Sequence, residues 1–114
     1  MHEYSLADAL VRRVEEEARK RGATAVKSIR VTLGELGGVE ARFLQSAYEM
    51  VREGTLCDQA ELLITVFPAE FRCPTCGKIF GRGDVLHCEK CDQPAQLSEV
   101  SEALQLESVE MEVP

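Results

Sequence analysis

Four cysteines in two CxxC pairs are the feature that most limits what this chain can fold into. The pairs are Cys73 with Cys76 and Cys88 with Cys91, and eleven residues separate them. Each pair can turn its two sulfurs toward one cation, and four thiolates at about 2.3 Å fill the coordination shell of a tetrahedral Zn²⁺ ion. Such a site keeps no open position for water or substrate, so we expect the zinc to be structural rather than catalytic.

Two other uses of the cysteines are weighed against zinc. Two disulfides require an oxidising compartment, and a thioredoxin-type redox pair requires a single CxxC that opens a helix. The segment that begins at Met1 lacks the basic start of a signal peptide, and its apolar residues are periodic. We therefore expect a reducing cytoplasm, in which the four thiols remain reduced and bind zinc.

Length and charge exclude several classes of protein. A chain of 114 residues is the size of one ordinary domain, and no apolar run approaches the roughly 18 residues that cross a bilayer, so we expect no membrane association. The formal net charge of -7 leaves no excess of Lys and Arg to displace counterions from phosphates. We therefore expect no nucleic-acid partner.

The spacing of apolar residues predicts two amphipathic helices. Over residues 6–21 the apolar positions fall three or four apart, and Gly22 follows as a stop signal. A second helix is predicted over residues 39–53, ended by Gly54. Its predicted buried side consists of six apolar residues: Val39, Phe43, Leu44, Ala47, Met50 and Val51. Cys57, which lies beyond this helix, is expected to be a small core residue.

Strand patterns occur in three places. Alternating apolar and polar residues predict strands at 29–33 and 61–67. In the final segment Leu104 and Leu106 share one parity whereas Val109, Met111 and Val113 take the other, so we predict a β-bulge near residues 107 and 108.

Together these patterns predict an α+β fold. Two helices pack on a small three-stranded, mainly antiparallel sheet, and a zinc-ribbon-like loop domain is inserted before the last strand. The expected division is an α/β domain of residues 1–68 and 97–114 and a zinc-binding domain of residues 69–96. Zinc substitutes for the hydrophobic core that so short a segment lacks.

The N-terminus holds a second group of metal-ligand types. The amine of Met1, the amide and imidazole nitrogens of His2, and Glu3 can surround one ion in a plane, and nitrogen-rich square-planar sites select Ni²⁺ or Cu²⁺. Glu40 is a further candidate ligand if the turn before the second helix lies close by. The alternative is that His2 is an ordinary exposed terminal residue, and this is the interpretation that spacing alone favours.

Several short motifs together resemble one family. They are Met1-His2-Glu3-Tyr4-Ser5-Leu6, Gly34-Glu35-Leu36, Val39-Glu40, Phe43 with Ala47-Tyr48, and the paired CxxC. Taken over the whole chain, they closely resemble the HypA/HybF family of hydrogenase nickel-incorporation proteins. The resemblance implies a nickel site at the Met1 amine, His2 and Glu3, with Glu40 contributing in some members. It also implies a structural zinc on Cys73, Cys76, Cys88 and Cys91.

The resemblance further implies a function and partners. The chain is expected to be a nickel metallochaperone, not an enzyme, that works with a GTPase of the HypB type and delivers Ni²⁺ to the hydrogenase large subunit. We expect a monomer or weak homodimer. Members that link nickel handling to pH or to urease have a His directly after a CxxC, whereas Gly77 and Asp92 stand there in this chain. The alternative function is a zinc-ribbon interaction module of a transcription or nucleic-acid complex.

Overall fold

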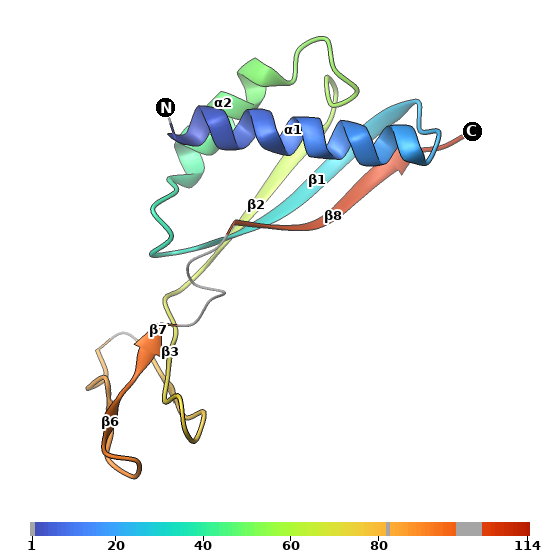
Figure 1. Cartoon of the computed structure of the whole chain (residues 1–114). Helices are drawn as coiled ribbons and strands as arrows, with labels where there is room; N and C mark the ends of the chain where they lie inside the picture. Colours follow the sequence, from blue (N-terminus) through green and yellow to red (C-terminus); the bar gives the residue numbers. More distant parts are fainter. Residues whose placement is uncertain (1, 82, 98–103) are drawn as a thin grey trace.

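The chain folds into a helix-covered sheet with a smaller, cysteine-containing part below it (Figure 1). The computed structural model describes residues 2–81, 83–97 and 104–114. The larger part consists of two helices and three strands: α1 (His2–Lys20), β1 (Ala25–Gly34), α2 (Ala41–Val51), β2 (Glu61–Phe67) and β8 (Leu104–Glu112). The molecule is elongated, with extents of 56 × 28 × 16 Å. Within the described residues, neither helix is both long and apolar enough to span a membrane.

The three long strands form one sheet in the order β2-β1-β8. The predicted three-stranded sheet under two helices is therefore confirmed. Antiparallel pairing joins β1 to β8, whereas β1 and β2 run parallel. A parallel pair requires a crossover connection, and α2 with its flanking loops supplies it.

The predicted β-bulge in the last strand is confirmed. Arg30 pairs with Ser108 and Val31 pairs with Leu106, so Glu107 is the extra residue in β8. The bulge reverses the parity of the strand, which is why the apolar residues on both sides of it face the same helices. The hydroxyl of Thr32 donates a hydrogen bond to Oε1 of Glu107 at 3.5 Å on the opposite face.

The core lies between α1 and the sheet. The helix buries one stripe, as predicted, and begins four residues earlier than the first apolar residue suggested. The buried side chains of α1 are Ala7, Leu10, Val11, Val14 and Ala18. The central strand contributes Ile29, Val31 and Leu33, each no more than 1% exposed. Cys57 is fully buried beside them, as predicted.

The predicted buried side of α2 is wrong at two positions. Phe43 and Met50 are 54% and 66% exposed, whereas Leu44 and Ala47 are buried as expected. Tyr48, which is outside the predicted set, is fully buried, and its hydroxyl is satisfied there by a 2.8 Å hydrogen bond that it donates to the carbonyl of Ala60. The apolar surface of α2 is thus wider than the strip that α1 and the sheet cover.

Where the structure describes it, the smaller part contains only two-residue strands: β3 (Phe71–Arg72), β4 (Ile79–Phe80), β5 (His87–Cys88), β6 (Gln93–Pro94) and β7 (Gln96–Leu97). They pair as a three-stranded sheet, β4-β3-β7, and a hairpin, β5-β6. Its buried cluster is limited to Cys73, Phe80 and Cys88. So small a cluster cannot hold a fold by apolar burial alone, which agrees with the predicted zinc-ribbon-like segment before the last strand.

Candidate metal centres

The four cysteines of the two CxxC pairs converge on one point. Their sulfur atoms all lie within 4.8 Å of one another, and Sγ of Cys76 is 3.7 Å from Sγ of Cys88. A tetrahedron with Zn–S bonds of about 2.3 Å has edges of about 3.8 Å. The quartet of Cys73, Cys76, Cys88 and Cys91 therefore fits a zinc ion, and all five cysteines of the chain are free thiols.

Backbone turns hold each pair in place. The amide of Gly77 donates to the carbonyl of Cys73 at 3.0 Å, and the amide of Cys73 donates to the carbonyl of Lys78 at the same distance. Gly77 has a φ of 76°, and Asp92, the residue after the second pair, has a φ of 49°. Both CxxC turns thus end on a left-handed residue, a conformation that Gly and Asp tolerate better than most residues.

Electrostatics in the quartet favour a bound cation. Backbone N–H groups, first that of Cys76, lower the pKa of Cys73 to about 6. Burial, followed by the neighbouring thiols, raises the pKa of Cys91 to about 12. The first thiolate therefore forms readily, whereas ionisation of a further thiol is disfavoured by desolvation and by repulsion from the first negative charge. A divalent cation removes this opposition, because it neutralises the thiolates that it binds.

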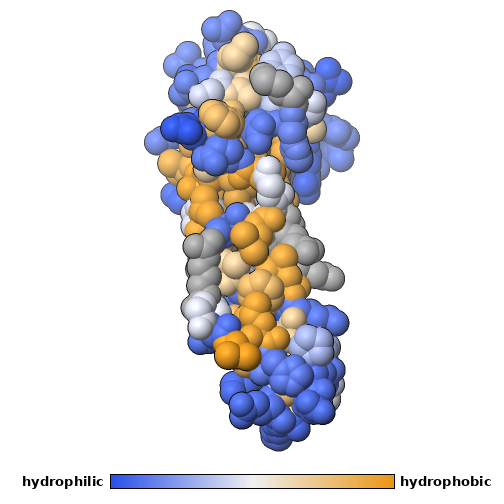
Figure 2. All heavy atoms as spheres, turned by 90° about the vertical axis from the view of Figure 1, so that its left-hand side faces the viewer, coloured by the Kyte–Doolittle hydropathy of each residue, from blue (hydrophilic) through white to orange (hydrophobic). Residues whose placement is uncertain are grey.

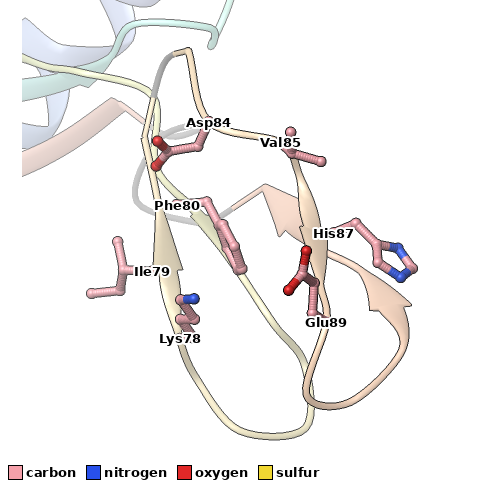
Figure 3. Close-up of a pocket in the computed structure, with 7 residues that line it drawn as sticks. All are labelled: Lys78, Ile79, Phe80, Asp84, Val85, His87 and Glu89. Carbon is pink, nitrogen blue, oxygen red and sulfur yellow. The ribbon is translucent and has the colours of Figure 1, made fainter.

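His87 lies next to Cys88 but is not part of the quartet. Its Nε2 is 3.1 Å from Oδ1 of Asp92. Figure 3 shows His87 projecting away from Phe80, at the rim of an open depression of about 500 Å³. Among the described residues, the quartet is the one group of three or more His, Cys, Asp or Glu side chains close enough to bind a metal ion together.

The N-terminal residues of α1 meet the start of α2. The backbone N–H of Glu40 donates a hydrogen bond of 3.3 Å to Oε2 of Glu3. These N–H groups, first that of Glu3 itself and then that of Glu40, lower the pKa of the Glu3 carboxyl. His2 is exposed in the same helical turn, and Glu40 is the residue that precedes α2. The fold thus brings together residues 37 positions apart, while Met1, the remaining predicted ligand, lies outside the described residues.

An apolar groove beside Glu3 was not predicted from the sequence. It encloses about 250 Å³ between the two helices. Its lining consists of Glu3, Tyr4, Phe43, Ser46, Ala47 and Met50. The sequence does carry one indication of this groove: the apolar stripe on α2 is wider than the face that a helix usually buries against a core.

Glu35 has a positioning role that the sequence alone did not assign. Its Oε2 accepts a hydrogen bond from the backbone N–H of Ala69 at 3.1 Å, and its own N–H donates to the carbonyl of Phe67 at 2.9 Å. Both bonds fix the chain where it leaves β2 toward the cysteine segment. The Gly34-Glu35-Leu36 motif drew attention to Glu35 in the sequence but did not predict these contacts.

Comparisons with known proteins extend over the whole chain. Residues 1–111 match the family model described as "Hydrogenase/urease nickel incorporation, metallochaperone, hypA". A hydrogenase maturation factor HypA from Wolinella succinogenes is 39% identical over 98% of this chain and 96% of its own length. Its counterpart in Aquifex aeolicus is 31% identical, with 99% of each chain covered.

Solved structures agree with these sequence matches. The solution structure of the Ni metallochaperone HypA from Helicobacter pylori superposes with a TM-score of 0.73 at 29% identity, covering 98% of each chain. A second solution structure of a HypA protein gives a TM-score of 0.81 at 31% identity, covering 97% of this chain and 96% of that one. With the family match over residues 1–111, these similarities establish that the chain belongs to the HypA family of hydrogenase and urease nickel-incorporation metallochaperones.

Proposed function

We propose that this metallochaperone binds Ni²⁺ at its N-terminus and delivers it, with a GTPase partner of the HypB type, to the large subunit of a [NiFe]-hydrogenase. The proposed ligands are the amine of Met1, the imidazole and amide nitrogens of His2, and Glu3, with Glu40 as a further ligand. Nickel is the cargo of the protein, and the zinc of the cysteine quartet is its resident metal. No bond in a substrate is broken.

The hydrogen bond between Glu3 and Glu40 is the observation that carries this proposal. It brings the residue that precedes α2 next to the second residue of α1, so that His2, Glu3 and Glu40 belong to one end of the fold. Glu3, whose pKa is lowered further by backbone N–H groups, is a carboxylate at neutral pH, as a ligand of a divalent cation must be. An exposed imidazole and an ionised carboxylate in one helical turn suit a nickel ion.

The exposure of this end suits transfer rather than storage. His2 is exposed, and the Glu3 carboxylate is held by backbone N–H groups rather than by a buried network. A partner's ligands can therefore reach the metal and displace one donor at a time. The quartet is different, because Cys73 and Cys88 are buried and four thiolates close the coordination shell. We therefore assign the zinc a structural role within a unit of residues 69–96.

The cellular setting completes the proposal. A cytoplasmic location keeps the five free thiols reduced and gives access to the GTPase and to the unloaded hydrogenase subunit. The alternative, a zinc-ribbon module that docks on nucleic acid, is disfavoured by the net charge of -7.

Nickel titration of the untagged protein tests the proposal. Binding is followed by calorimetry on zinc-loaded protein and on two matched variants, His2→Ala and His87→Ala, which remove the only two histidines in turn. We expect His2→Ala to lose at least about tenfold in nickel affinity, because removing even an outer-shell partner of a metal ligand costs about 10–100-fold, and His87→Ala to bind like the unmodified protein. The zinc content, measured separately, stays at one ion per chain in all three.

The result that contradicts the N-terminal site is equal nickel affinity in His2→Ala and the unmodified protein. A blocked amine gives an independent check, because a short N-terminal extension removes the Met1 donor without changing any side chain. If the extended protein binds nickel as tightly as the free form, the amine is not a ligand. Transfer to the hydrogenase large subunit, with and without the GTPase, then tests delivery.

A further inference from the structure

The chain passes from the main sheet to the smaller part through a short joint. Strand β2 ends at Phe67 and β3 begins at Phe71, so only residues 68–70 lie between them. Figure 1 shows β2 leading down into this joint. The chain returns to the sheet through residues 98–103, which lie outside the described residues. Contacts that fix the direction of the joint therefore contribute to how the two parts are oriented.

Among the described residues, apolar packing does not hold the two parts together. Their two buried clusters share no residue, and every extensive contact between described helices and strands lies within one part. Figure 2 shows apolar atoms on the face where the two parts meet. The apolar side chains next to the joint, Leu36 and Phe67, are however 50% and 41% exposed, so they form no buried interface. Contacts within the joint itself therefore matter more for the orientation.

A side chain extends the hydrogen-bond ladder into the joint. The parallel pairing of β1 with β2 ends at Gly34 and Phe67. One more backbone bond follows, because the N–H of Glu35 donates to the carbonyl of Phe67 at 2.9 Å. In a regular parallel ladder the next bond runs from the N–H of Ala69 to the backbone carbonyl of Glu35. Here the Glu35 side chain takes that role, since its Oε2 accepts from Ala69 at 3.1 Å. The ladder thus continues one step past Pro68, which has no N–H to donate.

The surroundings of Glu35 favour this contact. The turn after β1 is closed by a 3.0 Å bond from the N–H of Gly37 to the carbonyl of Gly34, and Glu35 lies inside it. Oε1 of Glu35 is withdrawn from solvent, and Ala69 is only 5% exposed. Burying a carboxylate oxygen costs free energy, so its contacts rather than chance keep the side chain there. Because the donor residue is buried, water competes little for the N–H of Ala69.

We propose that Glu35 is a latch that sets the direction of the smaller part, and that the joint becomes a hinge when the carboxylate releases the N–H of Ala69. The latch depends on the reach of the side chain, because the acceptor must span from the turn after β1 to the N–H beyond Pro68. Without it the ladder ends at Phe67. The cysteine quartet then turns as a unit relative to the sheet, with its own fold intact. This inference is independent of the proposed nickel site.

Three substitutions of Glu35 separate the reach of the side chain from its charge. Glu35→Gln removes the charge but keeps an oxygen at the same distance, so the latch should hold. Glu35→Asp keeps the charge but is shorter by one methylene, about 1.5 Å, and cannot bridge a contact that is already 3.1 Å long. Glu35→Ala removes the acceptor altogether. Glu61→Ala is the matched control, because Glu61 is exposed at the opposite end of β2.

NMR of the zinc-loaded full chain measures both the hydrogen bond and the orientation. We expect the Ala69 amide to exchange at least about tenfold faster in Glu35→Ala and Glu35→Asp than in the unmodified protein. Residual dipolar couplings of the two parts should fit one common alignment in the unmodified protein, Glu35→Gln and Glu61→Ala. In the other two variants the smaller part should require a second alignment of smaller magnitude. Zinc content and the chemical-shift pattern of residues 83–97 should stay the same throughout, which distinguishes a turning unit from an unfolded one.

The proposal is overturned if Glu35→Ala and Glu35→Asp keep a single alignment, or if Glu61→Ala loosens the smaller part as much as they do. Slow exchange of the Ala69 amide in Glu35→Ala would likewise contradict it, because another acceptor would then hold this N–H. If Glu35→Ala does not fold, the comparison of Glu35→Asp with Glu35→Gln decides alone, since both keep a polar side chain at this position.

Discussion

The carboxylate of Glu3 accepts a hydrogen bond from the backbone N–H of Glu40, across 3.3 Å, and so joins the first turn of α1 to the residue before α2. A negative charge at this place also favours α2, because the N-terminal end of a helix carries partial positive charge. The side chain of Glu40, the N-cap residue of α2, makes no capping hydrogen bond of its own. Glu3 therefore has two roles in the proposal, as a nickel ligand and as the contact that fixes the start of the second helix.

Glu3→Gln separates these two roles. Glutamine keeps an oxygen that can accept from Glu40 but loses the charge, so we expect nickel affinity to fall at least about tenfold while α2 keeps its N-terminal contact. Glu3→Ala removes both and should also speed amide exchange at Glu40. Calorimetry and hydrogen exchange, run on the same samples, measure the two effects. Equal nickel affinity in Glu3→Gln and the unmodified protein would remove Glu3 from the ligand set.

Zinc removal should affect the smaller part far more than the larger one. Cys73→Ser replaces a buried ligand of the quartet. Because the apolar cluster there is so small, we expect metal-binding energy of roughly 10–16 kcal/mol to hold residues 69–96 together. We expect loss of zinc and collapse of chemical-shift dispersion for 69–96, with the helices retained. Retention of both zinc and the native melting temperature in Cys73→Ser would show that the quartet is not a structural site.

The exposed face of α2 should tolerate polar substitution. Met50 is 66% exposed, so Met50→Gln should change the free energy of unfolding by no more than about 0.5 kcal/mol. Leu44, earlier in the same helix, is fully buried, and Leu44→Ala should cost about 2–5 kcal/mol. Urea unfolding of both variants measures the difference. A large loss in Met50→Gln would mean that this side chain is covered in solution.

Alkaline pH should destabilise the larger part through Cys57. Burial, with a further contribution from Glu15, raises the pKa of this thiol from 9.0 to about 11. Between these values the unfolded chain releases a proton that the folded chain retains, so ionisation favours unfolding. The stability that the neutral thiol contributes is complete below pH 9 and is lost as the pH rises through 11, on the order of 2 kcal/mol.

Cys57→Ala provides the measurement. Urea unfolding at several pH values between 8 and 11 should show a shallower loss of stability in the variant than in the unmodified zinc-loaded protein. Tyr48, whose pKa burial raises to about 12, is unchanged in both and contributes only at the upper end of the range. Parallel pH dependences in the two proteins would rule out the Cys57 thiol as the titrating group.

Local patterns were sufficient for part of the fold. The β2 strand was predicted at its observed bounds, and the parity change after Leu106 located the bulge at Glu107, because both are properties of consecutive residues. The spacing of the cysteines likewise predicted the quartet, since each CxxC turn brings its own two sulfurs together.

Relations between distant segments could not be read in this way. Periodicity shows that a strand has a buried face but not which strand lies beside it, so the parallel pairing of β1 with β2 was missed. The apolar pattern of α2 gave no measure of how much of the helix its neighbours cover, which is why Phe43 and Met50 were assigned to the core. The contact of Glu3 with Glu40 depends on both the helix packing and the turn between β1 and α2.

The place of β8 in the sheet has a consequence for how the chain reaches its native state. β1 is made early and can pair with β2, but its other neighbour comes from the last residues to be synthesised. Before β8 can dock, residues 68–103 must close as one long loop. We expect zinc binding to fold most of that loop into a compact insert and so to lower the entropic cost of closure by about 1 kcal/mol. Metal loading of the quartet is therefore expected to assist completion of a sheet that contains none of its ligands.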